Sequence, residues 1–383
     1  MHTARKKIVV LGMMSRHPVA GMIWLTVQYL IGLRRMGYDV WYVEPQGGAP
    51  GQNSSVEAEW LERVLRRFDL ADRWAYDAVH GDGQCYGMSD TALRELIRSA
   101  HWIFNLHGST KPTEELSRPG RLVYIGTDPV EVEISLWEGD ARSSSFLSPH
   151  CAFFTWGENL GNPDCRVPVP KDFDFKPTRQ PSVIDLWDDE SRIRGDLFTT
   201  IGNWKQPYRE VEFEGETYYW SKHHEFLKFI DLPARTSQRF ELALSSFDED
   251  DRRLLERNGW RVTEAARFGD NPDLYRDYIL GSRGEFTVSK EQYYRLKSGW
   301  FSDRSTSYLS AGRPVINQES GFSNIFPTGA GLFAFSTMDE LVSAVEAINS
   351  DYARHSRAAR DLAREYFSYE VVLGRMLFEL GDR

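Results

Sequence analysis

A polar run from Ser302 to Ser305 directly follows the aromatic loop Gly299–Phe301. Ser302 is a favourable N-cap residue, so the run predicts the start of a short helix that ends near Gly312. The first backbone N–H groups of a helix and the positive end of its dipole attract anions. The Ser302 and Ser305 hydroxyls and the Arg304 guanidinium would add hydrogen bonds. The pattern indicates a phosphate site, although an ordinary strand–loop–helix turn has the same sequence features.

Further polar residues of the second half follow the carboxyl ends of predicted strands. These residues are Gly202, Asn203, Lys205 and Lys290. In α/β folds the ligand crevice lies beyond the carboxyl ends of the strands, so the two lysines can add positive charge to a phosphate site. Either lysine can equally be an ordinary surface residue.

The first half offers candidates for acid–base chemistry. His17 lies in the loop after a predicted strand at 8–11, and a neutral imidazole there can accept a hydroxyl proton. Asp128 and Glu158 follow two later predicted strands and can orient the histidine or act as the base. His107 is a similar, weaker candidate. The alternatives are a loop histidine bonded to backbone and carboxylates that are solvated or cap helices.

Composition restricts the class of protein. The chain has 383 residues and a net charge of −10 without a run dense in Lys and Arg, which argues against a nucleic-acid partner. Three cysteines without a C-x-x-C pair fit reduced thiols and neither a disulfide framework nor a zinc site. No apolar run approaches the length needed to span a bilayer. We therefore expect a cytoplasmic protein that holds no metal.

Hydrophobic patterns predict two consecutive α/β domains. A strand at 8–11, a helix at 22–36 and a strand at 40–43 form a βαβ unit, but its loop lacks the G-x-G-x-x-G turn of dinucleotide-binding folds. Five of the 17 prolines fall within residues 163–181, which indicates a semi-rigid connector. The expected parts are a first domain at 1–165, a linker at 166–181, a second domain at 182–365 and a C-terminal helix at 366–383 that can pack back on the first domain. Within the second domain, Thr337 and Glu340 form a predicted capping box.

The segment after the polar run resembles the donor-binding half of GT-B glycosyltransferases. Its matching elements are Ala311-Gly312-Arg313-Pro314-Val315, the polar loop 318–324, Gly329-Ala330-Gly331-Leu332 and Asp339-Glu340. The close match covers roughly 60 residues, and the order of elements extends it loosely to the whole chain. The resemblance implies two Rossmann-like α/β domains facing each other across a cleft. It also implies a nucleotide-sugar donor in the second domain and an acceptor in the first.

One departure from that pattern matters. Many retaining members carry two glutamates eight positions apart, and alignment places Gly299 and Ser307 at those positions. Retaining chemistry therefore cannot be inferred. Gln318 and Glu319, just past a predicted strand, are the candidates for contact with the donor sugar. As an alternative, these two residues only solvate a loop.

The resemblance implies a glycosyltransferase that uses a nucleotide-diphosphate sugar, with a UDP-sugar as the expected class. The acceptor would be a hydroxyl-bearing small molecule or a glycan, and no cofactor beyond the donor itself is expected. Two alternatives stay open: a nucleotide-sugar epimerase of the same fold, and a non-catalytic nucleotide-sugar binding protein. The sequence does not indicate an oligomeric state.

Overall fold

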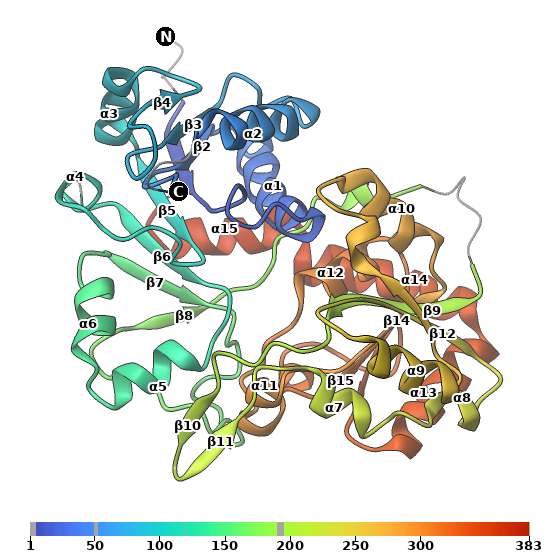
Figure 1. Ribbon diagram of the computed structural model, residues 1–383. Coiled ribbons are helices and arrows are strands. Elements are labelled where there is room, and N and C mark those ends of the chain that lie inside the picture. Colours follow the sequence, from blue (N-terminus) through green and yellow to red (C-terminus); the bar gives the residue numbers. More distant parts are fainter. Residues whose placement is uncertain (1–4, 50–52, 119, 190–194, 383) are drawn as a thin grey trace.

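The computed structural model describes residues 5–49, 53–118, 120–189 and 195–382, which form two lobes (Figure 1). The first lobe is built on an eight-stranded sheet of order β4-β3-β2-β1-β5-β6-β7-β8. All its neighbouring strands pair in parallel except β3 and β4. Its strands are β1 (Lys7–Leu11), β2 (Asp39–Glu44), β3 (Trp74–Asp77), β4 (Cys85–Tyr86), β5 (Trp102–Leu106), β6 (Leu122–Gly126), β7 (Ala152–Thr155) and β8 (Phe175–Pro177).

The second lobe is built on a six-stranded parallel sheet of order β13-β12-β9-β14-β15-β16. Its strands are β9 (Leu197–Asn203), β12 (Arg239–Ser245), β13 (Arg261–Glu264), β14 (Gly284–Thr287), β15 (Val315–Gln318) and β16 (Leu332–Phe335). A separate antiparallel hairpin joins β10 (Val211–Phe213) to β11 (Glu216–Tyr218). The central strands read as continuous apolar runs because helices cover both faces of a parallel sheet. The predicted α/β fold class is confirmed.

Helices flank both sheets, and the first helix of the chain contacts both lobes. The first lobe contains α1 (Ala20–Arg35), α2 (Ser55–Arg67), α3 (Asp90–Ser99), α4 (Glu114–Ser117), α5 (Glu131–Trp137) and α6 (Ala141–Leu147). Those after β8 are α7 (His223–Leu227), α8 (Leu232–Arg235), α9 (Glu249–Arg257), α10 (Pro272–Gly281), α11 (Glu291–Leu296), α12 (Asp303–Ser310), α13 (Met338–Ser350), α14 (Tyr352–Leu362) and α15 (Tyr369–Glu379). Within the described ranges, every helix is too short or too polar to cross a lipid bilayer.

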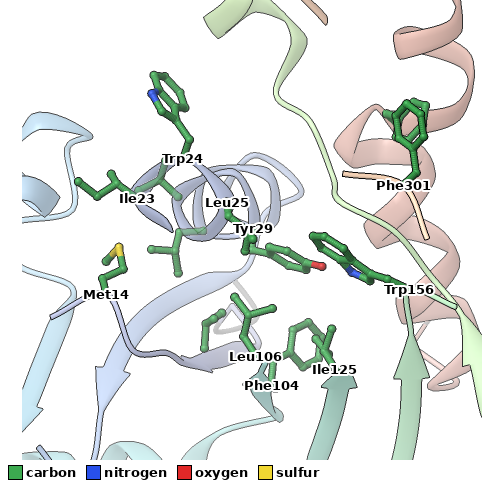
Figure 2. Packing of buried hydrophobic residues seen from close by; sticks show 14 of the residues in the cluster. Met14, Ile23, Trp24, Leu25, Tyr29, Phe104, Leu106, Ile125, Trp156 and Phe301 are labelled. Carbon is green, nitrogen blue, oxygen red and sulfur yellow. The ribbon is translucent and has the colours of Figure 1, made fainter. Parts of the chain in front are cut away.

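Helix α1 lies between the first sheet, α15 and the second lobe, and brings three parts of the chain together (Figure 1). Figure 2 shows its Ile23 and Tyr29 in one cluster with Phe104 from β5. On its other side α15 packs so closely that a Cβ at Gly32 would lie 2.7 Å from the Tyr369 Cβ. The last helix of the chain, red in Figure 1, therefore lies on the first lobe. α1 also reaches the second lobe, where the Trp24 indole donates to the carbonyl of Pro272 over 2.8 Å.

The chain crosses between the lobes twice, and the two crossings lie side by side. The backbone of Ser182 donates to the carbonyl of Phe367 at 2.6 Å and accepts from Tyr369 at 2.9 Å. A separate joint forms at Asn159 of the first lobe, whose amide Nδ2 donates to the carbonyl of Lys297 at 2.8 Å. The backbone N–H of Asn159 also donates to the carbonyl of Ser298 at 3.1 Å. This joint fixes the aromatic loop before α12 against the first lobe.

Candidate functional site

A cavity of about 750 Å³ lies between the lobes. It opens at the carboxyl ends of strands from both sheets, where α/β proteins place ligands. Five cationic side chains and two carboxylates are among the residues that line it, although the whole chain has a net charge of −10. The predicted site residues that the structure brings together here are His17, Asp128, Gly202, Asn203, Lys290, Ser302 and Arg304. Other polar lining residues include Arg16, His107, Thr127, Gln206, Tyr208, Arg209, Trp220, Lys222, Ser246, Trp300 and Asp303.

The N-terminus of α12 faces this cavity. The predicted cap is confirmed, because the Ser302 hydroxyl accepts from the backbone N–H of Arg304 at 3.2 Å. The Arg304 guanidinium is held by three acceptors: Glu285 at 2.5 Å, the carbonyl of Ile201 at 2.6 Å and the Thr287 hydroxyl at 2.8 Å. Burial opposes its charge, but the Glu285 carboxylate outweighs burial and raises the pKa of Arg304. Arg304 is therefore a permanently charged group in a fixed orientation.

Lys222 is the cation that sequence reasoning missed. Only 7% of this residue is exposed, and within the described part of the chain its amine has no hydrogen-bond or ion-pair partner, although it lies 5.9 Å from the centroid of the Trp300 ring. Burial, with the nearby charges of Arg304 and Lys290, holds the pKa of Lys222 well below its usual range. The nearby carboxylates of Glu285 and Asp303 oppose this shift, and a buried amine without a hydrogen-bond partner is costly in the absence of a ligand. The sequence gives little indication that Lys222 belongs to the site, since this lysine only follows the β10–β11 hairpin by a few residues.

A second cationic cluster surrounds Asp128. Its carboxylate accepts from the Tyr293 hydroxyl at 2.8 Å and lies 3.8 Å from Lys290 Nζ and 3.5 Å from Arg209 Nη1. Both cations also lie on the Trp220 ring, at 2.9 and 3.8 Å from its centroid. Burial acts to raise the pKa of Asp128, but Lys290 and Arg209 outweigh it, and the pKa falls below its usual value. Burial lowers the pKa of Lys290 to about 7 despite this carboxylate.

His107 lies at the carboxyl end of β5 in a backbone conformation with φ of 64°. Its ring Nδ1 is 2.8 Å from the Thr127 hydroxyl, and its Nε2 is a buried atom without a partner among the described residues. Burial lowers the pKa of His107 to about 4, so the ring is neutral at physiological pH. Non-glycine residues with positive φ cluster at functional sites. Sequence reasoning ranked His107 below His17, because nothing local to the sequence indicates this burial or strain.

The loop that carries His17 is held by an acid at the end of β2. Glu44 accepts from the Ser15 backbone N–H at 2.9 Å and from the Tyr42 hydroxyl at 2.5 Å. Dinucleotide-binding folds use an acid at this place to bind ribose, whereas here the carboxylate is engaged by the chain itself. Burial raises the pKa of Glu44, and the bonds from Ser15 and Tyr42 oppose that shift. His17 is exposed at the edge of the cavity.

Two predicted site residues point away from the cavity into ion pairs. Glu158 forms a buried pair with Arg179 at 2.5 Å and lines a different hollow beside α15. Lys205 lies 3.0 Å from Asp248 and 2.7 Å from Asp251, at the beginning of α9. The Asp251 hydrogen bond is the main cause of the raised pKa of Lys205. The structure does not bring either residue together with the cleft residues.

Three further predicted site residues, Ser305, Gln318 and Glu319, are absent from the lining of the cavity as described. The Ser305 hydroxyl is buried and has no partner among the described residues. The Gln318 amide donates to Glu225 at 2.6 Å and accepts from the backbone of Ser289 at 3.1 Å. Glu319 accepts from the backbone N–H two residues later. The Gln318–Glu319 pair is therefore engaged by the protein's own loops.

Two Rossmann-like lobes that face each other across a polar cleft, with the last helix returned to the first lobe, form the GT-B architecture. Solved structures share it over nearly the whole chain. A glycosyltransferase from Rickettsia africae ESF-5 matches at 10% identity and a TM-score of 0.55, with 98% of each chain covered. HepE of Anabaena in complex with UDP-glucose matches at 13% identity and a TM-score of 0.54, over 98% of this chain and 100% of that one. An alpha-glucosyltransferase in complex with UDP and a 13-mer DNA containing a HMU base matches at 9% identity and a TM-score of 0.60, with 99% of each covered.

These likenesses establish the fold, and the expected GT-B architecture is confirmed. No protein-family model matches the chain. No curated protein matches it either.

Proposed function

We propose that the chain is a glycosyltransferase that moves a sugar from a nucleotide-diphosphate donor, of the UDP-sugar class, to a hydroxyl group of a small molecule or glycan. The observation that carries this proposal is the amine of Lys222, which has no hydrogen-bond or ion-pair partner in the described chain and lies in the cleft near Arg304. Three solved structures of two proteins of the same fold contain UDP or UDP-glucose, which favours this nucleotide.

The chemistry of the donor explains why the cleft needs these cations. When the bond from sugar to diphosphate breaks, negative charge develops on the leaving group, and fixed positive groups stabilise it. Lys222, Arg304 and the first N–H groups of α12 supply that charge from the second lobe, with Ser302 as the helix cap. We propose that these groups hold the diphosphate without a metal ion. Full transfer activity in the presence of EDTA is the result expected, and loss of activity that Mg²⁺ restores would contradict it.

The first lobe faces the donor with the groups that would bind and activate the acceptor. We assign the role of base to His17, whose imidazole lies at the edge of the cavity in a loop held by Glu44. Asp128 is a weaker base because Lys290 and Arg209 lower its pKa. Its role in the proposal is to hold those two cations in place. His17→Ala should abolish turnover and leave nucleotide affinity unchanged.

The central experiment is a calorimetric titration of the chain with UDP, dTDP, GDP and ADP. We expect UDP to bind to the wild-type chain and its affinity to fall about 10- to 100-fold in Lys222→Met, because one charged hydrogen bond is worth roughly 1.5–3 kcal/mol. Lys171→Met, at an exposed lysine outside the cleft, is the matched control and should bind normally. If no nucleoside diphosphate binds at millimolar concentration, the proposed function is wrong.

Incubation with UDP-sugars separates transfer from the two alternatives. A transferase should hydrolyse its donor slowly and consume it faster when an acceptor is supplied. An isomerised sugar from donor alone would indicate an epimerase. Nucleotide binding without turnover over a broad acceptor panel would indicate a binding protein.

A further inference from the structure

The indole ring of Trp220 lines the cleft and contacts two of its cations. The ammonium nitrogen of Lys290 lies 2.9 Å from the ring centroid, and the guanidinium carbon of Arg209 lies 3.8 Å from it. Both distances are well inside the range of about 6 Å over which the face of a tryptophan ring attracts a cation. Trp220 is only 4% exposed, so water screens these two contacts little.

The carboxylates of the cleft do not account for the position of Lys290 by themselves. The nearest oxygen of Asp128 lies 3.8 Å from the Lys290 nitrogen, which is longer than a normal hydrogen bond. The centroid of the Trp220 ring is nearer to this nitrogen than the carboxylate is. Arg209 differs, because it also forms an ion pair with Glu131 at 2.9 Å. The ring is therefore the main close support of Lys290 and a second support of Arg209.

An aromatic ring and a carboxylate support a cation in different ways. A carboxylate carries a negative charge and cancels the positive charge beside it. The ring attracts the cation through its quadrupole and carries no net charge, so the cation can still attract another anion. Burial disfavours the charged form of a lysine, and a ring face opposes that effect.

We propose that Trp220 is a positioning residue, which holds Lys290 and Arg209 at the wall of the cleft by cation–π interaction and favours their charged forms without neutralising them. The two cations then remain able to attract an anionic ligand. That this ligand is the diphosphate of the donor rests on the proposed function. The cation–π interaction itself is a property of the unliganded chain.

The backbone on both sides of Trp220 is held by hydrogen bonds. The N–H of Tyr219, which precedes it, donates to the Glu291 carboxylate at the start of α11 over 3.2 Å. The hydroxyl of Ser221, which follows it, donates to the carbonyl of Trp204 at 3.2 Å. These bonds connect the end of the β10–β11 hairpin to two other segments of the second lobe. The direction of the ring is therefore fixed.

Gln292 connects the segments that carry the ring and both cations. It lies in α11, two residues after Lys290. Its amide donates to the carbonyl of Arg209 at 2.5 Å and to the carbonyl of Tyr218 at 3.2 Å. Arg209 itself has a φ of 65°, a conformation that is costly for a residue with a side chain. One buried side chain thus ties the backbone of Arg209 to the helix that follows Lys290.

The charged groups that face Lys290 come from both lobes. Asp128 of the first lobe and Asp303 of α12 favour its charged form, whereas Arg209 disfavours it. Lys222 is a further cation nearby. Burial is the largest influence and lowers the pKa of Lys290 to about 7. Because the ring favours the ammonium form, weakening its attraction should lower this pKa further.

Replacement of Trp220 by tryptophans with increasing numbers of ring fluorines tests the interaction in the full chain. Fluorine withdraws electrons from the ring face with little change in shape, so it weakens attraction to a cation and preserves packing. ¹H–¹³C spectra of chains labelled at lysine measure the pKa of Lys290, whose signal is assigned by its loss in Lys290→Met. We expect this pKa to fall in steps, by about one unit in the most fluorinated chain.

Trp260 is the matched control, because it is a buried tryptophan of the same lobe that stacks on Phe286. The same fluorination series at Trp260 should leave the pKa of Lys290 unchanged. A pKa that stays constant through the Trp220 series would overturn the proposal. An equal fall in the Trp260 series would also overturn it, because the cause would then not be the ring beside Lys290.

Titration with UDP gives a second measurement. We expect the affinity for UDP to fall about tenfold in Trp220→Leu and by a smaller factor in Trp220→Phe, which keeps a ring that attracts cations less strongly. The fluorinated chains should lose affinity in the same order as the pKa of Lys290 falls. Unchanged affinity in the most fluorinated chain would refute the role of Trp220 toward the ligand. Failure of UDP to bind the wild-type chain would refute the proposed function only, since the pKa series tests the cation–π interaction without a ligand.

Discussion

The two lobes contribute different kinds of polar group to the same cleft. The second lobe supplies positive charge through Lys222, Lys290 and Arg304. The first lobe supplies two imidazoles, His17 and His107, each carried by a loop that buried hydrogen bonds hold in place. One side is therefore suited to hold an anion, and the other to hold and activate a neutral hydroxyl group. Two lobes of the same architecture can therefore take different roles, one in binding the donor and the other in the chemistry of the acceptor.

A second contrast lies within the second lobe, between Arg304 and Lys222. Arg304 is compensated, because the fully buried Glu285 accepts from its Nε at 2.5 Å. Lys222 has no such partner within the described ranges, although it is similarly buried. Arg304 therefore belongs to the folded structure as much as to the site, whereas Lys222 gains a hydrogen-bonding partner only when an anion binds.

The largest effect is expected for Arg304→Ala. Removal of the guanidinium leaves the carboxylate of Glu285 buried without a counter-charge, which costs about 3–5 kcal/mol of the free energy of unfolding. Urea denaturation followed by tryptophan fluorescence measures this loss. Arg98→Ala removes an exposed pair with Glu95 and should change stability by less than about 1 kcal/mol. Equal losses in the two variants would show that Arg304 is not structural.

The next effect is a dependence of stability on pH that arises from Lys290. Its pKa is about 7 in the folded chain against an ordinary value of 10.5, so between these values the unfolded chain binds a proton that the folded chain has released. The free energy of unfolding contributed by Lys290 therefore rises with pH, by up to about 1.4 kcal/mol per pH unit. Urea denaturation at several values between about pH 7 and 9 should show a smaller slope in Lys290→Met than in wild type. Parallel curves for the two chains would contradict the shifted pKa.

Local signals in the sequence account for what could be predicted. The strand–helix–strand unit at the start of the chain could be predicted, because the hydrophobic period that defines it acts over a few positions. The Ser302 cap and the Thr337 capping box are confirmed for the same reason. The carboxyl edge of each sheet, which carries the site, could also be predicted, because ligands of α/β folds bind beyond the carboxyl ends of the strands.

The directions of individual side chains could not be predicted in this way. Lys205 follows a strand as expected, but acids at the beginning of α9 draw it away from the cavity. Glu158 also follows a strand, yet Arg179 from the connector pairs with it. Lys222 is the converse case, since the residues that surround it, Trp300, Arg304 and Lys290, lie far from it in the sequence. These outcomes depend on partners distant in sequence, which no short pattern records.

A smaller effect of opposite sign is expected for Lys222→Met in the absence of ligand. The variant removes a buried amine that has no hydrogen-bond or ion-pair partner among the described residues, so the free energy of unfolding should increase by about 1–2 kcal/mol while UDP affinity falls. Thermal unfolding with and without UDP measures both quantities in one experiment. Lys171→Met should change neither. A destabilised Lys222→Met would mean that the lysine supports the fold and would remove the contrast with Arg304.

The smallest effect concerns the contact that joins the two lobes at the site. Trp300→Phe keeps an aromatic ring against Tyr293 but loses the hydrogen bond from the indole to the carbonyl of Thr127. We expect a loss of about 1 kcal/mol in the free energy of unfolding, measured by urea denaturation, because one buried carbonyl loses its donor. Trp102→Phe is the control, since its indole nitrogen is buried without a partner among the described residues. Equal stability of Trp300→Phe and Trp102→Phe would mean that the hydrogen bond from Trp300 to Thr127 does not contribute to joining the two lobes.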